Sequence, residues 1–231
     1  MAVKPNVKVG RRFIKRLTQL VQQHRELLLA IHNKRNEASL ETILSEQFLM
    51  AVAVLWEAFV NDLFIAYVTM KPETFLNSLE ERINASVSEK FGSEAAKSIK
   101  LKLPESITRN KALALVDPKG WNIAFVSFEA MANRANQILA AAHAQKFALA
   151  AEDVQLLNLL VALRNYIGHR SLASRQSLKQ ALLAATDPAN LPFTAQLRDI
   201  GSYLKFKNAN GESRAILLAR RLETIAGRIS N

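Results

Sequence analysis

The stretch FLMAVAVLWEAFVNDLFIAYV, which runs from Phe48 to Val68, decides the fold class. Its length is close to the ~20 apolar residues that a helix needs to cross a bilayer. However, Glu57, Asn61 and Asp62 lie at its centre, and charged side chains at that depth are costly in lipid. We therefore predict a helix buried in the protein core and covered on most sides by other helices, and we expect no membrane partner.

The sequence on either side of this stretch also has a helical pattern. The central helix is expected to span about residues 39–70, since Pro72 cannot continue its hydrogen-bond ladder. Residues 10–35 form the expected first helix, because their apolar side chains recur at helical spacing, and residues 1–8 precede it as a short lead. Further helices are expected at 74–90, 93–101, 121–144, 151–168, 174–185 and 211–229, with a turn at 117–120 and a loop at 187–192.

These patterns predict an all-α protein, a helical bundle around two long antiparallel helices. Only residues 201–207 are ambiguous between strand and helix. The chain has 231 residues, of which 49% are hydrophobic and 22% are charged. This is a globular balance, and we expect one helical domain over residues 1–231.

The charge balance favours a polyanionic partner. The formal net charge is +11, which suits RNA or DNA better than a membrane surface, although a merely basic protein is the plainer interpretation. Part of the surplus lies in a polar segment, residues 72–111, where Lys97, Lys100 and Lys102 are candidate nucleic-acid contacts. There is no cysteine, which is compatible with the reducing cytoplasm, where we expect the protein to reside.

The chemical signature of the chain is LVALRNYIGHR, residues 160 to 170. Arg164 can hold a phosphate with its fork of donors, His169 can move a proton near neutral pH, and Asn165 can orient a neighbour. On a helix Asn165 and His169 share a face, and Arg170 follows as a further candidate nucleic-acid contact. The alternative is an ordinary helix end, at which a histidine suits the negative pole of the helix dipole.

Glu57 is a candidate supporting residue. A carboxylate in so apolar a helix needs a partner, which Arg164 or His169 would supply, and Asn61, one turn further on, would join them. The alternative is a partly exposed acid on a helix edge. The remaining histidines, at positions 24, 32 and 143, lack metal-ligand spacing, and there is no glycine-rich phosphate loop. We therefore expect neither a metal nor another cofactor.

The string from Leu163 to His169 resembles the signature of the HEPN superfamily, which is Arg, commonly followed by a polar residue such as Asn, then a short spacer and His. The segment from Leu55 to Leu63 resembles the long early helix of these proteins, particularly the RiboL-PSP and MAE-type branch. The resemblance is strongest over residues 39–185; residues 72–111 would be a basic insert and residues 190–231 a C-terminal extension.

The resemblance implies a function. HEPN proteins are helical and usually dimeric, and many are metal-independent ribonucleases of toxin–antitoxin and other defence systems. For this chain it implies RNA as substrate, a homodimer, a cognate antitoxin protein, His169 as general acid or base, Arg164 as phosphate clamp and Asn165 as orienting residue. Two alternatives stay open: a non-catalytic HEPN module that binds nucleotide, RNA or protein, and a plain helical interaction protein with a chance motif.

Overall fold

The computed structural model describes residues 3–98, 104, 106–117, 125–185 and 200–231. Over these ranges the chain forms eleven α-helices and one 3-10 helix, and the sole β pairing is an isolated bridge between Lys207 and Ser213. The predicted all-α class is confirmed. The helices are α1 (Pro5–Ile31), α2 (Glu37–Met70), α3 (Glu73–Phe91), α4 (Ser93–Ser98), α5 (Arg109–Val116), α6 (Phe128–Ile138), α7 (Ala141–Ala144), η1 (Gln145–Phe147), α8 (Ala151–His169), α9 (Leu172–Ala184), α10 (Ile200–Lys205) and α11 (Arg214–Ser230).

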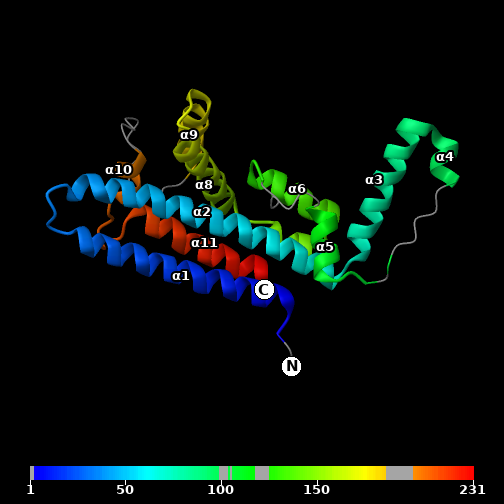
Figure 1. Ribbon diagram of the computed structural model, residues 1–231, viewed down its shortest axis with the longest axis horizontal. Coiled ribbons are helices and arrows are strands. Elements are labelled where there is room, and N and C mark those ends of the chain that lie inside the picture. The colour runs from blue at the N-terminus through cyan, green and yellow to red at the C-terminus, as the bar shows by residue number, and fades with distance from the viewer. Residues whose placement is uncertain (1–2, 99–103, 105, 118–124, 186–199) are drawn as a thin grey trace.

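Three long helices form the body of the molecule. Figure 1 shows α1 and α2 side by side as an antiparallel pair, with α11 lying along both of them. Phe13 and Leu17 of α1 are almost completely buried in this contact. At Gly10 the backbones approach so closely that any side chain would collide with Ser230 of α11, so that only glycine fits there.

The predicted core helix is α2. By length and composition it could span a membrane, but 61% of its most apolar window is buried inside the protein. Leu49, Val52 and Phe64 are fully or almost fully buried, because α1, α5, α8, α10 and α11 all pack against this helix. Val54 is an exception, with 56% of its surface exposed. Part of one face of α2 is therefore not covered by the described part of the chain.

Several helix boundaries differ from the predicted ones; the first helix ends at Ile31 rather than at residue 35, and α5 lies in a segment where no helix was predicted. The first helix begins at Pro5, inside the expected lead, because the fixed φ of proline suits the first helical position. The helix expected over 121–144 is interrupted: Ser127 caps the start of α6, and Leu139 takes an extended conformation before α7 begins. Residues 121–124 of that prediction, the turn at 118–120 and the loop at 187–192 lie outside the described residues.

The ambiguous segment 201–207 is mostly helical. It contains the greater part of α10, and Lys207 then forms the isolated bridge to Ser213 at the start of α11. At the other end of the molecule α3 and α4 project away from the body, and Figure 1 shows them well apart from α8 and α9. No residue of α4 is buried.

Candidate functional site

The motif lies on the second half of α8, which runs antiparallel to α2. The Nε of Arg164 is 3.5 Å from Oε1 of Glu57. Further along α8, Gly168 faces Met50, whose Cε is 4.0 Å from the position of a Cβ at this glycine. The register is clear from this order, since residue numbers rise along α8 while their partners' numbers fall along α2. The motif side of α8 is therefore held against the middle of the core helix.

The first turn of α8 is anchored by a buried charge. Asp153 is fully buried, and it accepts hydrogen bonds from Arg221 Nε at 2.6 Å and Arg228 Nη1 at 2.7 Å, both on α11. An acid in the first turn is also favoured by the helix dipole. This contact fixes one end of the motif helix to the body of the molecule.

The other end of α8 is a corner between two helices. His169 is its last residue, and Arg170 takes a left-handed conformation, with φ of 49°, while its N–H bonds to Tyr166 O at 2.8 Å. Ser171 then begins α9 through a reciprocal capping box with Ser174. Because the chain turns away here, the His169 side chain is exposed.

The guanidinium of Arg164 is oriented on two sides. Its Nη1 donates to Oδ1 of Asn165 at 2.9 Å, and its Nε faces the Glu57 carboxylate. The side chains of Arg164 and Glu57 are 35% and 33% exposed, respectively. Nη2 of Arg164 has no partner within the described part of the chain. The group is thus held in place and still keeps N–H donors for an anion.

The predicted supporting residues agree in part with this geometry. Glu57 contacts Arg164, one of its two expected partners, although it is partly exposed rather than buried. Asn61 is 5% exposed one turn further along α2. Asp62, which follows it, turns to the other side and forms ion pairs with Arg12 at 3.4 Å and with Arg109.

The predicted nucleic-acid contacts lie in different places. Arg170 is beside the motif, where its guanidinium forms an ion pair with Glu46 and lies 5.8 Å from the ring centre of Tyr166. Lys97 forms an ion pair with Glu94 at 2.7 Å on the projecting α4, away from the motif. Lys100 and Lys102 lie outside the described residues.

Sequence reasoning missed Glu46 and Met50 as neighbours of the motif. Their spacing carries a signal, because residues 46, 50 and 57 share one face of a helix. Once Glu57 is paired with Arg164, the antiparallel register places the other two beside the end of α8.

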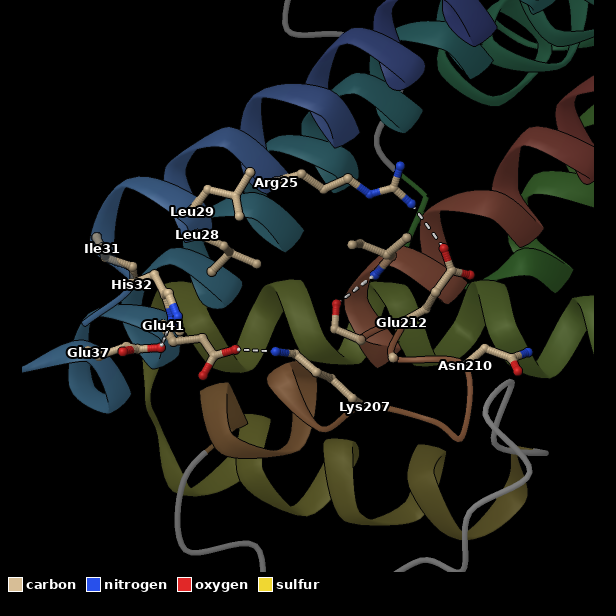
Figure 2. A pocket seen from close by; sticks show the side chains of 13 residues that line it. Arg25, Leu28, Leu29, Ile31, His32, Glu37, Glu41, Lys207, Asn210 and Glu212 are labelled. Atoms are coloured by element: carbon tan, nitrogen blue, oxygen red, sulfur yellow. Dashed lines mark hydrogen bonds and ion pairs between the residues drawn. The ribbon is translucent and has the colours of Figure 1, made fainter. Parts of the chain in front are cut away.

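A separate cavity of about 540 Å³ lies at the far end of the α1–α2 pair. Figure 2 shows an apolar wall from the end of α1 facing a polar wall from α2 and the start of α11. Its arginine and lysine are each paired with a carboxylate, Arg25 with Glu212 at 2.9 Å and Lys207 with Glu41 at 3.5 Å, and His32 Nδ1 lies 3.0 Å from Glu37. The cavity has no contact with the motif.

Among the residues that the structure describes, no group of three or more His, Cys, Asp or Glu side chains is placed to hold a metal ion. Comparison with protein families, curated proteins and solved structures gives no match for this chain. Any function proposed for it therefore depends on the motif and on the geometry around it.

Proposed function

We propose that this chain is a HEPN-type endoribonuclease that cleaves RNA without a metal ion and acts as a toxin or defence effector. The observation that carries the proposal is the state of Arg164, whose guanidinium is fixed by Asn165 and Glu57 while Nη2 has no partner in the described part of the chain. The same helix ends at His169, whose side chain is exposed to solvent. The proposed phosphate clamp and the proposed proton-transfer group therefore both lie in the last part of α8.

The proposed reaction is attack of an RNA 2′-OH on the adjacent phosphorus. A base takes the 2′-OH proton, the bond from phosphorus to the 5′ oxygen breaks, and an acid protonates that oxygen. The products carry a 2′,3′-cyclic phosphate and a 5′-OH. His169 would act as base or acid, and the positive charge of Arg164 would stabilise the charge that develops on the phosphorane oxygens.

A two-fold dimer would supply both proton-transfer groups, since each chain has one motif histidine. Exposed apolar side chains flank the motif and favour this arrangement: Val54 on α2 is 56% exposed and Leu172, at the start of α9, is 75% exposed. A second copy that covers them would bring two His169 side chains to one cleft. An antitoxin protein would act by covering the same cleft.

The test of catalysis is cleavage of single-stranded RNA by the purified protein in EDTA. We expect products with 2′,3′-cyclic phosphate ends, and a rate loss on the order of 10² to 10⁴ in His169→Ala, the usual contribution of a positioned acid or base. His32→Ala is the matched control, because His32 is also exposed but follows the end of α1 and pairs with Glu37 at 3.0 Å rather than with a residue of the motif. Unchanged activity in His169→Ala, or activity abolished by EDTA, would overturn the mechanism.

The test of assembly is light scattering. We expect about twice the chain mass of 25.7 kDa. Charges introduced by Val54→Glu and Leu172→Glu should give monomers without cleavage activity, because a buried unpaired charge opposes association. Leu183→Glu, at an exposed apolar position at the far end of α9, should remain dimeric and active. A monomeric wild type would contradict the proposed assembly.

A further inference from the structure

A cluster of basic side chains lies where α1 begins and where α2 and α11 end, close to the N and C marks of Figure 1. The segment formed by α7 and η1 closes this end. The ring of His143 stacks on Tyr67 of α2, with centroids 4.4 Å apart, and Lys146 Nζ lies 5.4 Å from the centre of the same tyrosine ring.

Three lysines belong to the same end of the molecule as His143: Lys71 follows the last residue of α2 and its N–H bonds to Tyr67 O, Lys4 precedes the first residue of α1, and Lys146 is three residues beyond His143. Burial lowers the pKa of His143, and the nearby charges of Lys146, Lys71 and Lys4 lower it further. Burial, followed by the charge of Lys4, likewise lowers the pKa of Lys146. Within the described ranges none of these lysines forms an ion pair, whereas the cations around the cavity of Figure 2 are paired with carboxylates.

Among the described residues no carboxylate side chain forms an ion pair with this cluster, and the polar groups nearby are neutral. The Tyr67 hydroxyl donates to Ile229 O, and burial raises its pKa to about 12, so it stays neutral. Asn6 Nδ2 donates to Ser230 O at 2.9 Å. Nδ1 of His143 is buried and has no hydrogen-bond partner in the described structure. Within the described residues these cations therefore repel one another, one of them partly desolvated, and none of the lysines has a carboxylate ion-pair partner.

We propose that Lys4, Lys71, Lys146 and His143 form a binding site for a phosphate group. A phosphate beside the His143 ring would neutralise the repulsion and accept hydrogen bonds from the lysine ammonium groups. Lys71 lies 14 residues beyond Glu57, about 21 Å along a helix. This site therefore holds a different phosphate from the one at Arg164, and it does not depend on the proposed ribonuclease activity.

The phosphate has two sources, a free phosphate ion or the backbone of RNA, and the experiment distinguishes them. The first arm measures the Tm of the full chain in sodium phosphate and in sodium chloride of equal ionic strength. We expect phosphate to raise the Tm more than chloride does, because it binds the folded state alone. The double variant Lys71→Gln/Lys146→Gln should lose this difference, and its Tm without phosphate should be unchanged or higher, since the repulsion is gone.

The second arm measures RNA affinity against salt concentration in the His169→Ala background. One neutralised phosphate of a single strand contributes about −0.7 to the slope of log affinity against log salt, and the double variant should lose that amount. Lys71→Arg/Lys146→Arg should behave as wild type in both arms, and Lys97→Gln, which removes a lysine that is already paired, should also do so.

A phosphate-specific Tm rise that the double variant loses identifies free phosphate as a ligand. A flatter salt slope without that rise identifies the RNA backbone. The site is refuted if neither readout distinguishes the Gln double variant from wild type, or if Lys97→Gln changes the two readouts as much as the double variant does.

Discussion

Asp153 and His169 lie at opposite ends of one helix, and their surroundings differ in kind. Asp153, in the first turn of α8, is fully buried and takes one hydrogen bond from each of two arginines of α11. His169, in the last turn, is exposed, and nearby Arg164 is one-third exposed with Nη2 unpartnered in the described structure. An acidic side chain in the first turn and a basic side chain in the last turn are both typical of a helix, so the helix dipole does not account for the contrast.

This difference separates a structural role at the start of α8 from a candidate binding role at its end. A buried charge whose oxygens are satisfied by the fold has nothing left to offer a ligand, and its removal leaves its partners uncompensated. A partly exposed charged side chain that is held in place but keeps hydrogen-bond donors without partners contributes little to stability, and it can still bind a substrate. Substitutions at the start of α8 should therefore lower stability, whereas substitutions at its end should lower activity or RNA binding.

The largest expected effect on stability is at the anchored end. Asp153→Ala should lower the free energy of unfolding by about 3 kcal/mol, because loss of one partner leaves the arginines without their buried counter-charge. Urea denaturation followed by circular dichroism measures this. Glu152→Ala is the matched control: its side chain is 73% exposed and 3.9 Å from Arg221, so its effect should stay within about 0.5 kcal/mol. Equal losses in the two variants would remove the distinction between the ends.

A change of pH separates the body of the molecule from the motif. His24 is 3% exposed, stacks on Phe48, and has its pKa lowered to about 4 by burial. The unfolded chain binds this proton near pH 6.5, so stability falls as the pH drops from 6.5 towards 4, by about 2 kcal/mol at pH 5. The fall should be smaller by that amount in His24→Phe and unchanged in His169→Ala. Denaturation curves at pH 7 and pH 5 decide this.

The sequence predicts the features that depend on local pattern. A long apolar run must be buried, and α2 is the centre of the core. A carboxylate within that run needs a partner, and Glu57 contacts Arg164 at 3.5 Å. The end of α2 before Pro72 follows from the chemistry of proline. Each of these expectations needs only the residue and its neighbours along the chain.

Features that depend on how distant helices meet were not predictable in the same way. Asp153 is 68 residues from Arg221 and 75 from Arg228, and only the seven-residue spacing of the two arginines indicates that they share a face. The partner of Arg170 was also missed, because the register between α2 and α8 is set by packing. The break at Leu139 has no signal in the apolar spacing, which continues through it.

The smallest expected effect on stability is at the corner itself, where Arg170 has a φ of 49° and forms an ion pair with Glu46. In Arg170→Gly, relief of the left-handed conformation contributes about 1–2 kcal/mol. The greater freedom of glycine in the unfolded chain costs about 0.5–1 kcal/mol, and the lost exposed ion pair costs at most about 1 kcal/mol. These contributions nearly cancel, so the free energy of unfolding should change by less than about 1 kcal/mol.

RNA binding by the same variant tests whether Arg170 also contacts RNA, which the stability measurement cannot do. If Arg170 leaves Glu46 to hold a backbone phosphate, the slope of log affinity against log salt for single-stranded RNA should be flatter by about 0.7 in Arg170→Gly. An unchanged slope with unchanged stability would show that Arg170 keeps its contact with Glu46 and does not hold an RNA phosphate.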